Sequence, residues 1–263
     1  MTDSASAQFA GKIAVVTGGA QGIGEATARL LAARGAAGLV LVDRRAEQGE
    51  AVAKSLNAAG TKAIFVEADL ADPEAVAKVI PAADKAFGRV DILANIAGLT
   101  DRGTILDTSV ELWDRLFAIN ARAPFLLTQA MARRLKEAGK PGSIVNVITM
   151  SSHGGQPFLT GYSSSKGALA TLTKNTALGL RPQRIRVNGI NLGWADTPGE
   201  HAIQARDGNP PDWLDRAAPA QPFRRLIEPR DVAGLAVYLL SDAAVMMTGA
   251  LIDFDQNVMG AYG

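Results

Sequence analysis

Tyr162 and Lys166 are the two residues of this sequence whose types and spacing most directly suggest chemistry. They are four residues apart, so on a helix both side chains project from one face. A phenol has a pKa near ~10 and is a poor base at neutral pH, but a neighbouring ammonium favours the phenolate. In the other direction, the phenol is a suitable acid for a carbonyl oxygen that receives hydride. Taken alone, the spacing is also typical of a solvated helix face, so its meaning depends on what precedes it.

A glycine-rich stretch, residues 17–24 (TGGAQGIG), ends 138 residues before Tyr162. It follows the apolar run 13–16 and leads into a segment with helical spacing. Glycines let a backbone turn tightly and approach a pyrophosphate, whose charge then lies at the helix N-terminus. The order of strand, glycine loop and helix predicts a dinucleotide-binding site. In that context Tyr162 and Lys166 are predicted to be an acid/base pair.

An acid at the end of the second apolar run bears on which dinucleotide is bound. Asp43 lies 19 residues after Gly24, where a carboxylate can accept hydrogen bonds from both hydroxyls of an adenine ribose. The same carboxylate would repel a 2′-phosphate, and the neutral Gln21 supplies no phosphate counter-charge. Arg44 and Arg45 could reach a 2′-phosphate, although a solvated charged pair at a helix start is the favoured interpretation. The sequence favours NAD, with NADP as the alternative.

The elements that must position these residues alternate along the chain. Short apolar runs rich in β-branched residues alternate with longer segments of helical period, and several runs are apolar throughout, as in strands buried on both faces. This alternation predicts an α/β fold with a doubly wound parallel sheet of the Rossmann type and helices on both faces. The predicted strands are 13–16, 39–42, 63–67, 90–94, 144–148, 185–190 and 251–254, and the longer predicted helices are 46–59, 73–87, 109–136, 161–180 and 231–241.

One segment departs from this rhythm. Five of the twelve prolines fall between Asp196 and Arg225, in a stretch that is long for a loop inside a compact domain. Because it follows the sixth predicted strand, we expect residues 196–225 to form a substrate lid, the alternative being a surface insertion without function. No repeat or second domain boundary is evident, so residues 1–263 are predicted to form one domain.

Composition excludes several classes of function. The 27 basic and 26 acidic side chains give a net charge of +1, which points to neither nucleic acid nor an anionic membrane. The absence of cysteine excludes disulfides and thiolate chemistry, and two histidines leave little for a metal site. No apolar run approaches the ~18 residues of a membrane helix, and the segment 1–10 does not resemble a signal peptide. We therefore expect a cytoplasmic protein with a small-molecule substrate.

Nearly the whole sequence resembles the short-chain dehydrogenase/reductase family in its compact, single-domain form. Residues 17–24 resemble the glycine motif of the family, residues 69–70 its acid-containing pair beside adenine, and residues 95–98 its Asn-Asn-Ala-Gly motif. The resemblance implies a catalytic set of Asn120, Thr149, Tyr162 and Lys166, in which Asn120 holds a water of the proton relay. It implies, together with the reasoning above, a cofactor site of Gly18, Gln21, Gly22, Ile23, Gly24, Asp43, Asp69, Leu70, Asn95, Ala97, Gly98, Tyr162, Lys166, Leu192, Gly193 and Thr197.

Three positions depart from the family pattern. Thr149 stands where the family usually has serine, thirteen residues before the catalytic tyrosine. Its hydroxyl can still donate to a substrate oxygen, with Ser151 and Ser152 as alternatives if the loop register shifts. Ile96 replaces an asparagine, and Leu192 replaces the proline of the Pro-Gly stretch that leads to Thr197.

These observations predict hydride transfer between NAD and a secondary alcohol or carbonyl, with a small polar substrate such as a sugar or polyol. The polar residues of the 196–225 segment fit such a substrate, although solvated charges explain them equally well. An NADP-dependent 3-oxoacyl or other carbonyl reductase is the first alternative. A non-catalytic nucleotide-sensing protein is the second, since Thr149 departs from the usual serine. The family resemblance also implies a homotetramer.

Overall fold

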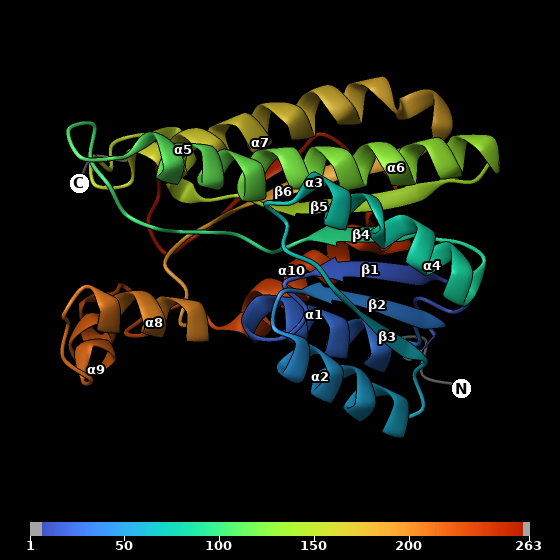
Figure 1. The fold of residues 1–263 in the computed structure, drawn as a ribbon, viewed down its shortest axis with the longest axis horizontal. Coiled ribbons are helices and arrows are strands. Elements are labelled where there is room, and N and C mark those ends of the chain that lie inside the picture. Colours follow the sequence, from blue (N-terminus) through green and yellow to red (C-terminus); the bar gives the residue numbers. More distant parts are fainter. Residues whose placement is uncertain (1–6, 260–263) are drawn as a thin grey trace.

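A sheet of seven parallel strands forms the centre of the computed structural model, which describes residues 7–259 (Figure 1). Its strand order is β3-β2-β1-β4-β5-β6-β7, and every neighbouring pair is parallel. The strands are β1 (Ile13–Thr17), β2 (Gly38–Asp43), β3 (Ala63–Glu67), β4 (Ile92–Asn95), β5 (Gly142–Val147), β6 (Ile185–Leu192) and β7 (Leu251–Phe254). The predicted doubly wound parallel sheet is confirmed. Residues 1–6 of the segment 1–10, which was compared with a signal peptide, lie outside the described range.

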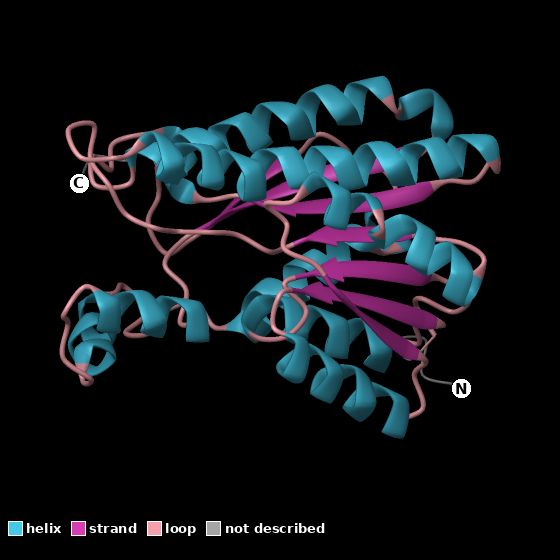
Figure 2. Cartoon of the chain, viewed as in Figure 1, coloured by secondary structure: helices cyan, strands magenta, loops and turns pink. Residues whose placement is uncertain are grey.

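Helices cover both faces of the sheet, as Figure 2 shows. One face is covered by α1 (Gly22–Ala33), α2 (Ala46–Ala58) and α10 (Pro229–Leu240). The other face is covered by α3 (Pro73–Ala77), α4 (Val79–Phe87), α5 (Val110–Phe117), α6 (Ala123–Glu137) and α7 (Thr160–Gly179). Among the described residues, no helix is both long and apolar enough to cross a bilayer.

The two helical layers bury the two faces of each strand in turn. Val16 belongs to the apolar cluster that contains α1 and α10, whereas its neighbour Val15 belongs to the cluster that contains α4 and α6. Both valines are fully buried. Successive side chains of a strand point to opposite faces, so only a continuous apolar run satisfies both layers. Each fully buried aliphatic side chain contributes roughly 1.5–3 kcal/mol.

The strand order reverses between β1 and β4, and this reversal locates the crevice. From β1 the chain adds β2 and β3 on one side of the sheet and β4 to β7 on the other. The loops that leave β1 and β4 therefore diverge at the carboxyl edge of the sheet. In open α/β sheets this position is the usual place for a ligand.

Three predicted elements differ from the structure, and the first is the helix predicted over 73–87, which is divided at Lys78 into α3 and α4. The helix predicted over 109–136 is interrupted by a π-helical turn, η1 (Ala118–Arg122), between α5 and α6. The segment 196–225 contains α8 (Pro198–Arg206), α9 (Trp213–Ala217) and a short 3₁₀ turn, η4 (Ala218–Ala220), so it is largely helical. Pro198 is at the start of α8, a position that does not require its missing N–H. Figure 1 shows α8 and α9 standing away from the sheet.

Candidate active site

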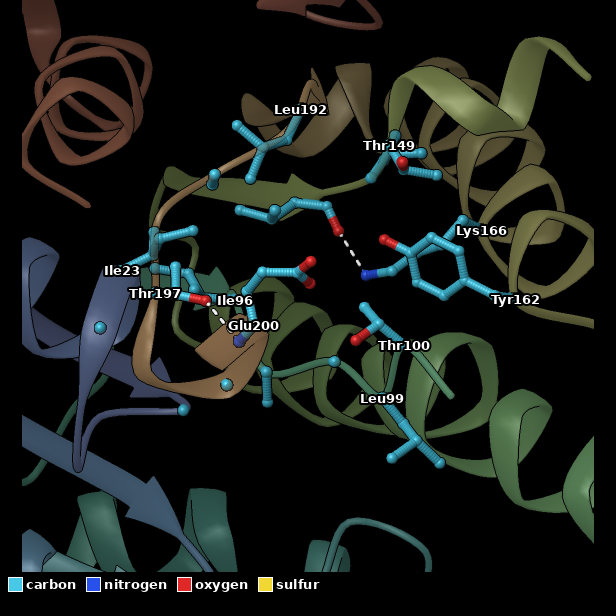
Figure 3. Close-up of a pocket in the computed structure, with 18 of the residues that line it drawn as sticks. Ile23, Ile96, Leu99, Thr100, Thr149, Tyr162, Lys166, Leu192, Thr197 and Glu200 are labelled. Atoms are coloured by element: carbon cyan, nitrogen blue, oxygen red, sulfur yellow. Dashed lines mark hydrogen bonds between the residues drawn. The ribbon is translucent and has the colours of Figure 1, made fainter. Parts of the chain in front are cut away.

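A cleft of about 840 Å³ opens at the carboxyl edge of the sheet, where the strand order reverses. The glycine loop, the loop after β4, a 3₁₀ turn η2 (Met150–His153) and the start of α7 form its walls, and α8 borders it on the remaining side. Figure 3 shows Tyr162, Lys166, Thr149 and Glu200 facing this space. Side chains from distant parts of the chain are thus brought to one place.

The glycine loop is shaped by close backbone approach. The amides of Gly18 and Gly19 donate to the carbonyl of Val42, and Gly18 has a positive φ of 71°. A Cβ on Gly24 would lie 2.0 Å from the carbonyl oxygen of Gly18, so only glycine fits there. Gln21 precedes α1 without giving it a side-chain cap. The first-turn N–H groups of α1 are consequently available to an anion, and the loop fits a dinucleotide pyrophosphate.

Asp43 ends β2 at the wall of the cleft, and its side chain is mostly buried. One carboxylate oxygen accepts the amide of Ala20 at 3.3 Å, and the other accepts the amide of Arg45 at 3.1 Å. The guanidinium of Arg45 lies 3.7 Å from the same carboxylate. Arg44 is exposed at the rim. The Asp43 carboxylate is therefore held in place by the amides of Ala20 and Arg45. It also partly neutralises the charge of the Arg45 guanidinium.

Asn95 and Asn120 do not line the cleft, unlike the other predicted site residues. Asn95 donates to Asn146 at 2.8 Å and joins β4 to β5. Asn120, in the π turn, accepts from the amide of Leu99 and donates to its carbonyl, both at 2.9 Å, so it fixes the loop after β4. Its amide nitrogen also donates to Ser165 Oγ at 3.0 Å, which links the π turn to α7.

The space beside Gly98 lies between Asn120 and Lys166. A Cβ on Gly98 would lie 3.3 Å from Lys166 Nζ and 3.4 Å from Asn120 Oδ1. The two polar atoms therefore approach the same small volume from α7 and from the π turn. This arrangement brings Asn120 and Lys166 together as the resemblance implied, although the water itself remains an expectation.

Thr149 begins the 3₁₀ turn that follows β5. Its Oγ1 accepts the amide of Ser151 at 3.3 Å and lies 3.2 Å from Ser151 Oγ. A hydroxyl that accepts from the backbone keeps its own proton free to donate elsewhere. Thr149 and Ser151 both line the cleft, whereas Ser152 is not among the lining residues.

Tyr162 and Lys166 lie on one face of α7, as their spacing predicted, and both are almost completely buried. Burial raises the pKa of Tyr162 to about 12, and the charge of Glu200 acts in the same direction, while a hydrogen bond with Thr149 opposes it. Burial lowers the pKa of Lys166 to about 8. The Lys166 ammonium donates to the carbonyl of Val147 at 2.7 Å.

This differs from the expectation that Lys166 lowers the pKa of Tyr162. The loss of water around the phenol outweighs the other influences on it, and the Lys166 ammonium is directed to a backbone carbonyl. Tyr162 is consequently a phenol at neutral pH. It is ready to donate a proton, and a positive charge beside it is needed before it can accept one readily.

The segment after β6 borders the remaining part of the cleft. Leu192, Gly193 and Thr197 all line it. The amide of Gly193 donates to Phe254 on β7, and a Cβ on Gly193 would lie 2.1 Å from the Asp255 carboxylate. Thr197 caps α8 by accepting the amide of Glu200 at 3.1 Å. A leucine at position 192 is thus accommodated because Gly193 and the Thr197 cap still set the path of the chain.

Sequence reasoning treated Glu200 only as one polar residue of the 196–225 segment, but the structure places it in the cleft. Its carboxylate is directed toward Tyr162 and Lys166 (Figure 3). Arg102 and Gln204 line the cleft beside it. The capping of α8 by Thr197 was the one available signal, because it puts Glu200 in the first helical turn, next to the predicted cofactor site.

Comparisons with known proteins agree with this site. Residues 18–256 match a family model described as enoyl-(acyl carrier protein) reductase. Cis-4-hydroxycyclohexanecarboxylate dehydrogenase of Sinomonas cyclohexanicum is 38% identical over 94% of this chain and 96% of its own length. Carbonyl reductase (NADPH) 2 of Sus scrofa is 36% identical over 96% of this chain and 98% of its own. A short-chain type dehydrogenase/reductase from Mycobacterium marinum has a TM-score of 0.88 at 29% identity, covering 97% and 98% of the two chains.

The chain belongs to the short-chain dehydrogenase/reductase family. Its relatives are dehydrogenases and reductases of hydroxyl and carbonyl compounds, so the chain is an oxidoreductase that acts on alcohols or carbonyls with a nicotinamide cofactor.

Proposed function

We propose that this protein transfers hydride between NAD and a small, polar secondary alcohol, with sugars and polyols as the first candidates. The observation that carries the choice of NAD is the fixed carboxylate of Asp43 in the cleft wall. Two backbone amides already bind it, so it cannot turn away from a ribose placed at the end of β2. A 2′-phosphate there would meet the negative charge of this carboxylate, which the Arg45 guanidinium at 3.7 Å offsets only in part.

The proton chemistry belongs to the side chains of α7 and η2. When bound, the nicotinamide cofactor supplies the hydride or accepts it. Tyr162 exchanges a proton with the alcohol or carbonyl oxygen, and Thr149 donates a hydrogen bond to that oxygen. Lys166 holds the nicotinamide ribose and, with Asn120, leads protons away from Tyr162. Burial of Tyr162 and Lys166 excludes bulk water from the exchange.

Polar side chains around the outer part of the cleft support a hydroxylated substrate. Arg102, Glu200 and Gln204 line it together with Gln156 and Gln221. In this proposal α8 and α9 form the substrate lid, since α8 contributes Glu200 and Gln204 directly. Such a wall offers hydrogen bonds to several hydroxyls of one substrate.

The test is the absorbance of NADH while the purified protein is supplied with sugars, polyols, hydroxysteroids and simple secondary alcohols, first with NAD and then with NADP. Turnover of a polyol or sugar with NAD is the expected result. Strong preference for NADP and for 3-oxoacyl substrates would instead identify the reductase alternative. Cofactor binding without turnover of any compound would identify a nucleotide sensor.

We also propose that the protein acts in the cytoplasm as a homotetramer. Large apolar side chains are exposed on three neighbouring helices, at Val110 of α5, Phe125 of α6 and Leu178 of α7. Unpaired apolar surface of this kind is typical of an interface between subunits. Light scattering is expected to give a mass four times the 27.4 kDa of one chain, and a monomer mass would contradict the proposal.

A further inference from the structure

Glu200 is held in the cleft by one of its two carboxylate oxygens. Oε1 accepts hydrogen bonds from Trp194 Nε1 at 3.0 Å, from Gln204 Nε2 at 2.6 Å and from Arg102 at 3.3 Å. The other oxygen, Oε2, accepts no hydrogen bond from any side chain or amide in the described part of the chain. The side chain is only 15% exposed. A nearly buried carboxylate thus keeps one oxygen free, and Figure 3 shows the group directed into the cleft.

The surrounding charges leave Glu200 negative in character. Arg102, its one cationic partner within residues 7–259, also binds Asp207 at 3.0 Å. The next arginine, Arg206, pairs with Asp101 and Asp207. At this wall two guanidinium groups are therefore shared among three carboxylates, those of Glu200, Asp101 and Asp207. The charge of Glu200 reaches the reacting phenol, because it contributes to the raised pKa of Tyr162.

We propose that Glu200 is a specificity-determining residue, whose free oxygen accepts a hydrogen bond from a second hydroxyl of the substrate and whose charge excludes substrates with an anionic substituent. The inference rests on the proposed function, because it concerns the alcohol that Tyr162 serves. A hydrogen bond to a buried charged group contributes about 1.5–3 kcal/mol, which corresponds to roughly ten- to hundredfold in kcat/KM. A carboxylate in the same place would meet like charge in a site with little water.

A purely structural role for Glu200 makes a different prediction. In that case Glu200 only accepts the hydrogen bonds of Trp194, Gln204 and Arg102. Its loss would then destabilise α8 and reduce turnover of every substrate equally. Selectivity between substrates of one shape therefore separates the two roles.

The test uses three alcohols on one ring, namely cyclohexanol, cis-1,4-cyclohexanediol and cis-4-hydroxycyclohexanecarboxylate. Values of kcat/KM with NAD are measured for the wild type and for Glu200→Gln, which keeps the side-chain length and an acceptor for the three donors. Glu50→Gln is the matched control, because Glu50 is an exposed acid of α2 outside the cleft lining. Thermal unfolding of each variant reports on folding.

We expect the wild type to prefer the diol to cyclohexanol and both to the carboxylate. In Glu200→Gln the ratio of diol to carboxylate should fall at least tenfold, while Glu50→Gln keeps the wild-type ratio. If Glu200→Gln does not fold, Glu200→Asp should retain the exclusion of the carboxylate and lose the preference for the diol. Ratios that stay constant, including a uniform loss for all three alcohols, would overturn the inference.

The outcome separates this inference from the proposed function. A wild type that oxidises these alcohols with ratios insensitive to position 200 contradicts the role of Glu200 alone. A wild type that oxidises neither these alcohols nor the sugars and polyols of the wider panel contradicts the proposed substrate class itself, and the inference falls with it.

Discussion

Lys166 donates a 2.7 Å hydrogen bond from its ammonium to the backbone carbonyl of Val147, the last residue of β5. This contact fixes the middle of α7 against the sheet edge and positions Tyr162 one helical turn earlier. It holds the ammonium at a place where burial lowers the pKa of Lys166 to about 8. Lys166 therefore helps to position α7, and its buried positive charge lowers the stability of the fold.

The first prediction concerns stability and pH. The pKa of Lys166 is about 8 in the folded protein against an ordinary lysine value of 10.5, so between these values the unfolded chain binds more protons. The free energy of unfolding should consequently rise with pH in this window, by up to about 1.4 kcal/mol per pH unit. Lys166→Met should lack this increment when denaturant unfolding is followed from pH 7 to pH 10. Lys54→Met, at an exposed position of α2, is the control, and an identical slope in Lys166→Met and the wild type would contradict the prediction.

The second prediction concerns Tyr162. Tyr162→Phe removes the acid/base hydroxyl and keeps the ring, so we expect kcat to fall roughly 10²–10⁴-fold. Binding of NADH, followed by its fluorescence, should change little because the glycine loop and Asp43 are untouched. Substantial residual turnover would move the proton transfer to another group.

The third prediction concerns Thr149 and its neighbour. Thr149→Val removes the hydroxyl that hydrogen-bonds the phenol and is proposed to bind the substrate oxygen, so kcat should fall about 10²–10³-fold. Thr149→Ser should retain most of the activity. Ser151→Ala is the informative companion in the same assay, because a larger loss in Ser151→Ala than in Thr149→Val would assign the role to Ser151.

The fourth prediction concerns the choice of cofactor. Asp43→Asn keeps an acceptor oxygen for one of the two amides, those of Ala20 and Arg45, which bind different oxygens of Asp43, and it removes the charge that opposes a 2′-phosphate. The ratio of kcat/KM with NADP to that with NAD should rise at least tenfold. Glu67→Gln, at the exposed end of the neighbouring strand β3, provides a charge-matched control. An unchanged ratio in Asp43→Asn would mean that Asp43 does not discriminate between the cofactors.

The fifth prediction concerns the glycine loop. A methyl group on Gly24 would lie 2.0 Å from the carbonyl oxygen of Gly18, and backbone must move to accept it. Gly24→Ala should weaken NADH binding at least tenfold and lower the melting temperature. Gly234→Ala is the matched control, because nothing lies within 4 Å of that position in α10, and alanine there should be neutral or slightly stabilising. Equal behaviour of the two variants would contradict the steric argument.

The sequence was sufficient for the parts of the fold that follow from local pattern. Continuous apolar runs predicted the buried strands, as the run 39–42 predicted β2. Burial between two helical layers leaves no room for polar side chains on such a strand. The glycine loop was equally readable, since the close approach of Gly24 to Gly18 admits only one residue type. Both features depend on neighbours in sequence or on simple steric limits.

Features that depend on tertiary contacts were not readable. In the π turn, the side chain of Asn120 forms hydrogen bonds with Leu99 and Ser165, which lie 21 and 45 residues away in the sequence. The raised pKa of Tyr162 follows from its burial, and the four-residue spacing of Tyr162 and Lys166 does not reveal that burial. Glu200 looked like one solvated acid among several, because its approach to Trp194, Gln204 and Arg102 requires the complete wall.

The order of the strands also constrains how the chain can assemble during synthesis. The central strand β1 pairs with β4, and the amide of Ile13 binds the carboxylate of Asp91, 78 residues later. Until that part of the chain has left the ribosome, the backbone N–H and C=O groups along one edge of β1 have no strand to pair with. Closing so long a loop is slow, and an open strand edge is prone to aggregate. A nascent chain that stops before β4 should therefore need protection by a chaperone, whereas one that extends beyond β4 can complete the centre of its sheet.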